Sequence, residues 1–120
     1  MRSFLILILL WLSPLTIAQA GEADVVNVEV KKTGTNTYQF IVTVSHNDQG
    51  WDHYANKWDV IGPDGTIFGT RTLYHPHDNE QPFTRSLSGV RIPKEINKAT
   101  IRAHDSVHKY GGKVVEVDLP

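Results

Sequence analysis

The sequence contains no cysteine, and its only methionine is Met1. A folded domain of this chain therefore has no disulfide, and no thiolate is available as a nucleophile or a metal ligand. A lipid anchor attached to a cysteine side chain is not expected for the same reason. Stretches with helical periodicity are also missing after residue 20, whereas apolar and polar residues alternate frequently, which predicts strands.

An excess of charge of either sign is absent as well. The chain has 12 Lys and Arg residues against 13 Asp and Glu residues, and its formal net charge is −1. This balance argues against a nucleic-acid partner, which requires a basic patch, and against a polybasic membrane-binding segment. Six histidines are present, and their positions carry the functional prediction.

The first twenty residues have the pattern of a cleavable signal peptide. Arg2 supplies a positive charge, residues 4–12 form an apolar run too short to span a bilayer, and Ala18-Gln19-Ala20 is a small-x-small cleavage site. We therefore expect residues 1–20 to be removed, leaving a single domain at residues 21–120 with no membrane attachment. The predicted location is the bacterial periplasm or the extracellular space.

Seven short alternating segments separated by turn residues are expected in the mature domain. They cover residues 24–32, 37–45, 53–61, 66–74, 83–92, 99–105 and 113–119. The expected core residues are Val26, Val28, Val30, Tyr38, Phe40, Val42, Val44, Tyr54, Trp58, Val60, Ile101, Ala103, Val115 and Val117. This pattern predicts an all-β, seven-stranded antiparallel sandwich of the immunoglobulin-like kind.

The last two segments carry a resemblance to a known fold. Residues 99–106, followed by Gly111-Gly112 and residues 113–117, resemble the final hairpin of a fibronectin type III domain. The resemblance implies a second sheet in which the expected strands follow the spatial order fourth, third, sixth and seventh. It implies no particular chemistry, because many unrelated functions occur on this fold.

The histidines gather in three of the connections between strands. In the expected topology, the connections after the second, fourth and sixth strands meet at one end of the sandwich. All six histidines lie in or beside these connections: His46, His53, His75, His77, His104 and His108. We expect His53 and His104 to point outward from adjacent strands, close enough for contact across the sheet.

This clustering predicts a metal site. The expected ligands are His75, His77, His104 and His108, with His53 as an additional ligand. Imidazoles without sulfur ligands suit Cu(II) or Zn(II), and Cu(I) is disfavoured. Nearby carboxylates are candidates for oxygen ligands or for acceptors that orient the imidazoles: Asp52, Asp78, Glu80 and Asp105. His46 is expected to be structural, because it continues the alternation of the buried residues of its strand.

Other interpretations of the same loops remain open. Trp51 and Tyr110 would serve a non-enzymatic recognition module that binds a periplasmic protein or a carbohydrate. Clustered histidines would also serve a pH sensor, since they repel one another when protonated. Tyr54 and Tyr74 are expected to cap the core. No nucleophile or phosphate-binding motif is apparent, so we expect no enzymatic activity, and the sequence predicts no oligomeric state.

Overall fold

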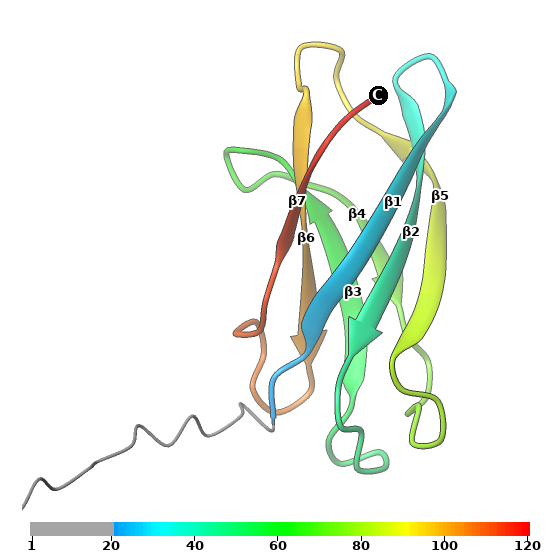
Figure 1. The fold of residues 1–120 in the computed structure, drawn as a ribbon. Coiled ribbons are helices and arrows are strands. Elements are labelled where there is room, and N and C mark those ends of the chain that lie inside the picture. The colour runs from blue at the N-terminus through cyan, green and yellow to red at the C-terminus, as the bar shows by residue number, and fades with distance from the viewer. Residues whose placement is uncertain (1–20) are drawn as a thin grey trace, which may run out of the picture.

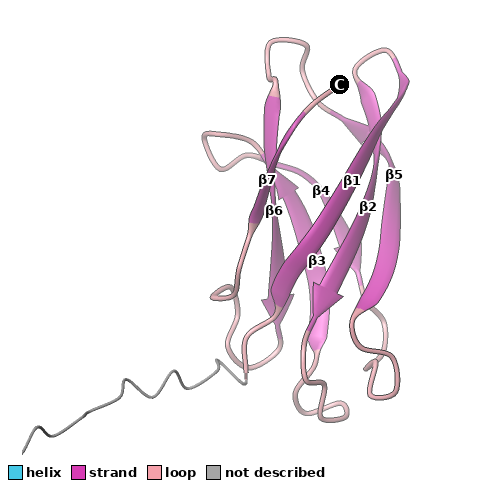
Figure 2. Ribbon diagram, in the orientation of Figure 1, coloured by secondary structure: helices cyan, strands magenta, loops and turns pink. Residues whose placement is uncertain are grey.

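A computed structural model describes residues 21–120, so the predicted signal peptide lies outside the described residues. Seven strands are present (Figure 2): β1 (Asp24–Gly34), β2 (Thr37–Ser45), β3 (Ala55–Ile61), β4 (Ile67–Thr72), β5 (Phe83–Arg91), β6 (Lys98–Asp105) and β7 (Val115–Asp118). Within the described range, no helix is long and apolar enough to cross a membrane.

The strands form two antiparallel sheets that face each other (Figure 1). One has the order β1-β2-β5 and the other the order β4-β3-β6-β7. The all-β, seven-stranded sandwich is thus confirmed, and so is the strand order expected for the second sheet. β3 begins at Ala55 and β4 ends at Thr72, so both strands are shorter than expected and His53 and His75 lie in loops.

The core forms between the two sheets from alternate residues of the central strands. All four inward residues expected for β2 are buried, and Trp58 and Val60 of β3 and Ile101 and Ala103 of β6 are buried opposite them. Val115 and Val117 of β7 are partly buried and pack against this cluster. The central strands therefore show the period-2 pattern that a half-buried sheet requires.

Two predictions at the core are wrong, namely the burial of Val26 and the capping of the core by Tyr74. Val26 is 49% exposed, because a shift in the β1–β2 register between Val25 and Asn27 puts Val25 in the core instead. Tyr74 is 77% exposed, because Leu73 takes the buried position just after β4. Tyr54 is half-buried.

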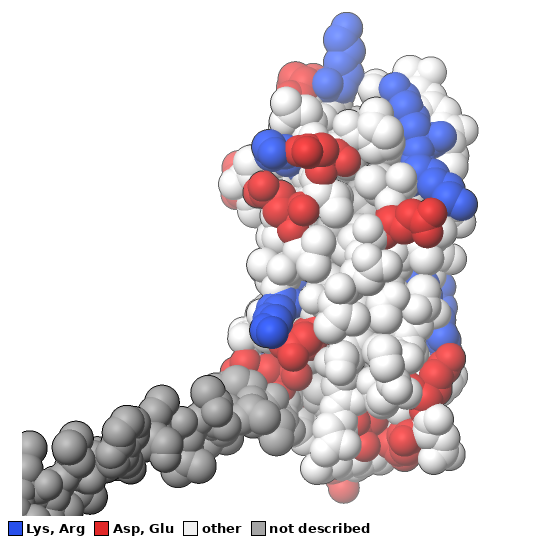
Figure 3. Space-filling model, viewed as in Figure 1, with Lys and Arg blue, Asp and Glu red and all other residues white. Residues whose placement is uncertain are grey.

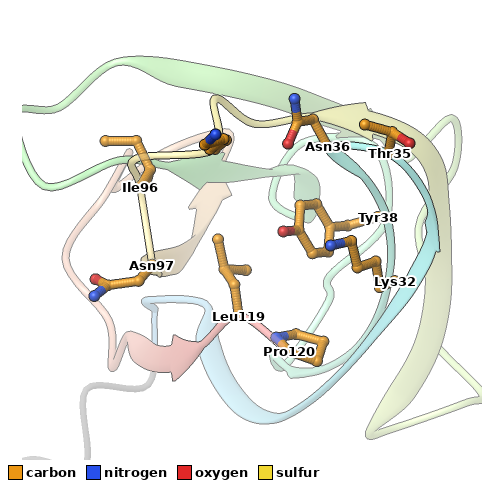
Figure 4. A pocket seen from close by; sticks show the side chains of 9 residues that line it. Lys32, Thr35, Asn36, Tyr38, Ile96, Asn97, Leu119 and Pro120 are labelled. Atoms are coloured by element: carbon orange, nitrogen blue, oxygen red, sulfur yellow. The ribbon is translucent and has the colours of Figure 1, made fainter.

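The β2–β3, β4–β5 and β6–β7 loops meet at one end of the sandwich, the lower end in Figure 1, which we call the histidine pole. A pocket at the opposite end lies beside the carboxyl terminus (Figure 4). The charged residues that line this pocket are Lys32 and Lys94, and its lining includes neither histidine nor a carboxylate side chain. The two ends of the molecule therefore differ in chemistry.

A buried carboxylate attaches the β6–β7 loop to the outer face of the second sheet. Asp59 of β3 is 1% exposed although it points away from the core. It accepts hydrogen bonds from the Tyr110 hydroxyl (2.6 Å), the Thr70 hydroxyl (2.7 Å) and Nε of Arg102 (3.1 Å). The Arg102 guanidinium also lies 3.9 Å from the centre of the Tyr110 ring. Tyr110 therefore holds its loop against the sheet.

The charge of Asp59 is stabilised in the folded state. Burial alone would raise the pKa of Asp59, but the hydrogen bonds from Tyr110, Thr70 and Arg102 outweigh burial and lower the pKa below its ordinary value of 3.8. A carboxylate with a lowered pKa stabilises the fold fully above pH 3.8, and this contribution is lost as the pH falls through the folded-state pKa.

We predict that Asp59→Asn lowers the free energy of unfolding by about 2 kcal/mol at pH 7, because charge-assisted hydrogen bonds are lost. The difference from the parent protein should shrink at a pH below 3.8, where the parent begins to lose the same contribution. Urea denaturation at both pH values measures this. The control is Asp118→Asn, which removes an exposed carboxylate of β7 and should change stability little. An equal difference at both pH values would contradict the prediction.

Candidate metal centre

Three side chains from separate segments converge at the histidine pole. His46 follows β2, His53 lies in the β2–β3 loop and Asp105 ends β6. One potential ligand atom from each residue lies within 4.8 Å of the other two. Asp105 is fully buried, His46 is 4% exposed and His53 is half-buried. Two imidazoles and one carboxylate are therefore close enough to bind a single metal ion together.

The alternation of β2 explains the positions of His46 and Asp48. Residues 38, 40, 42 and 44 point into the core, and the same alternation continues beyond the end of the strand to positions 46 and 48. His46 and Asp48 are therefore buried, and Asp48 is 8% exposed. The core side of this strand thus changes from apolar residues to an imidazole and a carboxylate where it reaches the pole.

Asp48 connects three segments of the pole. Its Oδ1 accepts hydrogen bonds from Nδ1 of His46 and from the Ala55 amide (3.0 Å), and its Oδ2 accepts one from the His77 amide (2.5 Å). When the ring of His46 is neutral, a carboxylate at Nδ1 favours the tautomer with its proton on Nδ1, so that the Nε2 lone pair faces Asp105. This is the arrangement by which outer carboxylates orient the histidine ligands of metals.

Asp105 occupies the centre of the group. Its Oδ1 accepts hydrogen bonds from the amides of Val107 and His108, both 2.6 Å long. Its Oδ2 faces Nε2 of His46 and, at 2.7 Å, Nε2 of His53. The first oxygen therefore shapes the β6–β7 loop, while the second oxygen faces the imidazoles.

His108 extends the group toward solvent. The centre of its ring lies 5.1 Å from that of His53, which in turn lies 5.0 Å from that of His46. The turn that starts at Asp105 brings His108 to this place, and Ser106 joins it to the β2–β3 loop through two hydrogen bonds with the Tyr54 backbone, each 3.0 Å. Three imidazoles thus lie in a row from the interior to the surface.

The contact between His46 and Asp105 is favourable when a positive charge lies between the imidazole and the carboxylate. With Nδ1 of His46 hydrogen-bonded to Asp48, the Nε2 lone pair of the neutral ring would face a carboxylate oxygen of Asp105. Burial alone would lower the pKa of His46, but the hydrogen bonds to Asp48 and Asp105 outweigh burial and raise the pKa above 6.5. A proton or a metal cation at Nε2 of His46 can interact both with the nitrogen lone pair and with the carboxylate oxygen of Asp105.

The charge of Asp105 is also stabilised. Burial would raise the pKa of Asp105, but the amide hydrogen bonds from His108 and Val107 and the contacts with His46 and His53 lower it instead. The carboxylate therefore remains ionised under the conditions in which imidazoles are neutral, and an ionised carboxylate beside neutral imidazoles is a suitable ligand set for a divalent cation.

His104 lies apart from this group. Its Nδ1 is 2.6 Å from the side-chain oxygen of Asn56, and its ring contacts Tyr110 on the outer face of the second sheet. The expected contact between His53 and His104 is wrong, because His53 precedes β3 and its ring turns inward to Asp105. Burial, with Lys57 and Lys109 nearby, lowers the pKa of His104.

His75 and His77 form a second pair in the β4–β5 loop, with ring centres 4.7 Å apart. His77 is 5% exposed and stacks on Phe83 at 4.0 Å, and neither of its ring nitrogens has a hydrogen-bond partner among the described residues. Burial, together with Arg85 and His75, lowers the pKa of His77. Asp48 links this pair to the centre only through the His77 amide and a 3.9 Å contact with Nδ1.

The two residues expected to bind a ligand occupy different places. Trp51 is 66% exposed in the β2–β3 loop and contacts Tyr54 edge to face, with ring centres 5.7 Å apart. Tyr110 is 38% exposed and its hydroxyl is used by Asp59. Acidic side chains gather at the lower end of the molecule in Figure 3, and the exposed acids of the loops there are Asp52, Asp78 and Glu80.

Asp48 is the residue of this centre that sequence reasoning missed. The available signal was the period-2 pattern of β2, which places Asp48 on the same side as His46. Asp105 was recognised only as one of several neighbouring acids, and His46 only as a structural residue. The alternation that predicts the buried residues of β2 therefore also predicts that His46 and Asp48, which follow the strand, lie on its core side.

No family model matches the sequence. A protein of Halomicrobium mukohataei named "Putative lipoprotein" is 39% identical over 97 residues, which cover 81% of this chain and 47% of that protein, so the chain spans about half the length of this relative. The crystal structure of a hypothetical protein from Pyrococcus horikoshii OT3 matches with a TM-score of 0.54 and 15% identity, covering 84% of this chain and 92% of that chain. The second match shows a shared fold alone.

We predict that His46 of the metal-free protein titrates above pH 6.5 in an NMR titration, whereas His77 and His104 titrate below pH 6.5. A raised pKa stabilises the fold fully below pH 6.5, and this contribution is lost as the pH rises through the folded-state pKa. Asp48→Asn should lower the His46 value and leave the His104 value unchanged. A His46 value below 6.5 that Asp48→Asn does not change would contradict this account.

Proposed function

We propose that this chain is an extracytoplasmic metal-binding protein that holds one Cu(II) or Zn(II) ion at His46, His53 and Asp105, with His108 beside them. The observation that carries the proposal is the convergence of three ligand atoms within 4.8 Å of one another. Two of the three residues are also oriented by further hydrogen bonds, since Asp48 binds Nδ1 of His46 and two amides of the β6–β7 loop bind Asp105.

The chemistry of the ligand set favours these two ions. Imidazole nitrogen and carboxylate oxygen bind borderline divalent metals, and the intrinsic order of affinity places Cu(II) above Zn(II). The chain offers no cysteine and no methionine beyond Met1, which disfavours Cu(I). A binding role in carriage, buffering or delivery of the ion requires no further catalytic group.

The surroundings of the centre support the same function. Asp52 and Asp78 are exposed acids of the histidine pole that attract cations, whereas Glu80 is paired with Arg85 at 3.0 Å. The signal-peptide pattern of residues 1–20 supports a location outside the cytoplasm, and the name of the Halomicrobium relative supports the same location. A metal carrier in such a compartment accounts for both features.

Calorimetric titration of residues 21–120 with Cu(II) and with Zn(II) tests the site. We expect one ion per chain, and His46→Ala or Asp105→Asn should weaken binding by more than about 100-fold, because ligand loss exceeds the effect of losing an outer partner. The matched control is His75→Ala combined with His104→Ala, which removes two histidines of the same pole outside the centre and should leave the affinity unchanged.

Two results would contradict the proposal. Binding that survives His46→Ala but disappears in the control double variant would move the site to the outer histidines. No binding to the parent protein would exclude a metal site, and the exposed Trp51, which contacts the half-buried Tyr54, would then become the candidate surface for a protein or carbohydrate. Circular dichroism of each variant establishes that the sandwich is intact.

We further predict that Asp48→Asn weakens metal binding by about 10-fold to 100-fold without abolishing it. Asn keeps the size of the side chain and one acceptor oxygen, but it loses the charge that orients the His46 ring. The same titration measures this, with Asp78→Asn as the control at an exposed carboxylate of the pole. Equal affinity in Asp48→Asn and the parent would show that Asp48 has only a structural role.

A further inference from the structure

Gly21, the first residue that the structure describes, lies directly against the candidate metal centre. Its carbonyl oxygen is 3.0 Å from Nε2 of His46 and 3.0 Å from Nε2 of His53. These are the two nitrogens that also face Oδ2 of Asp105. A main-chain oxygen therefore lies beside the ligand atoms that define the centre.

A side chain at residue 21 would collide with the imidazole of His108 in its present position. A Cβ atom added to Gly21 would lie 2.0 Å from Nε2 and 2.4 Å from Cδ2 of His108. Only glycine permits this approach without displacing the imidazole. The main chain of residue 21 thus lies beside three histidines, His46, His53 and His108.

Strand pairing holds Gly21 in this place. Asp24 begins β1 and pairs with Ser45, the residue before His46. Ala23 is 1% exposed, and the Val25 amide donates a hydrogen bond of 2.8 Å to the Lys113 carbonyl, while the Lys113 amide donates one of 2.7 Å to Oδ1 of Asp24. Soon after Gly21, the chain is therefore already fixed to β2 and to the end of the β6–β7 loop.

The predicted cleavage after Ala20 changes the chemistry of Gly21. In the precursor, its nitrogen is a peptide amide, which is a poor ligand for a divalent metal. In the processed chain, the same nitrogen is an α-amine, whose lone pair can bind a divalent metal. An α-amine and the carbonyl oxygen of the same residue can together close a five-membered chelate ring on one metal ion.

We propose that removal of the signal peptide completes the metal centre, with the α-amine and carbonyl oxygen of Gly21 as ligands beside His46, His53 and Asp105. This inference rests on the metal site proposed above and on the cleavage site predicted from sequence. It makes high-affinity binding a property of the exported, processed chain. The precursor lacks the amine and therefore binds the ion more weakly before export.

Three forms of the protein test this inference. The first begins at Gly21 with a free amine, the second is the same chain with an acetylated amino terminus, and the third begins at Ala20, so that the Gly21 nitrogen stays in a peptide bond. All three contain the seven strands. Competition with a chelator measures Cu(II) affinity, and electron paramagnetic resonance of bound Cu(II) reports nitrogen coordination. His46→Ala in the first form is the control for the centre itself.

We expect the acetylated and Ala20 forms to bind Cu(II) at least about tenfold more weakly than the Gly21 form, with an altered resonance spectrum. Equal affinity and identical spectra in all three forms would overturn the inference while leaving the histidine site in place. No binding in any form would overturn the site and the inference together. Mass spectrometry of the exported protein provides an independent check, because an amino terminus other than Gly21 would also overturn the inference.

Discussion

The buried carboxylate of Asp105 is the constraint on which the histidine pole depends. A fully buried charge is costly unless several partners compensate it. Here two loop amides bind one oxygen and two imidazoles face the other. The turn of the β6–β7 loop and the orientation of the histidines therefore follow from the same requirement, which is to satisfy one fully buried carboxylate.

The sandwich supplies the rigidity that this arrangement needs. β2 and β6 are central strands of their sheets, and both deliver a polar residue to the pole at the point where their pairing ends. On the outer face, Asp59 and Tyr110 hold the β6–β7 loop against the second sheet. The ends of β2 and β6 thus support the centre from the core side, and the β6–β7 loop, which is attached to the second sheet, supports it from the solvent side. This support favours a preorganised site.

Much of this structure could be predicted from sequence because strand periodicity is a strong signal. The alternation of β2, the turn residues and the gathering of six histidines in three loops predicted the sandwich and its chemically distinct pole. The loop side chains were harder to predict, because a loop has no period. His53 turns inward and His104 outward, although both were expected to point outward on neighbouring strands. The role of Asp48 depends on contacts between three segments, which composition alone does not show.

We propose that one metal ion binds between β2 and β6 at the histidine pole. The most direct test is anomalous diffraction at the zinc absorption edge from crystals of residues 21–120 grown with Zn(II). The account predicts a single strong peak about 2.0–2.2 Å from Nε2 of His46, Nε2 of His53 and an oxygen of Asp105. A peak at His75 and His77 or at His104, with none at Asp105, would contradict it.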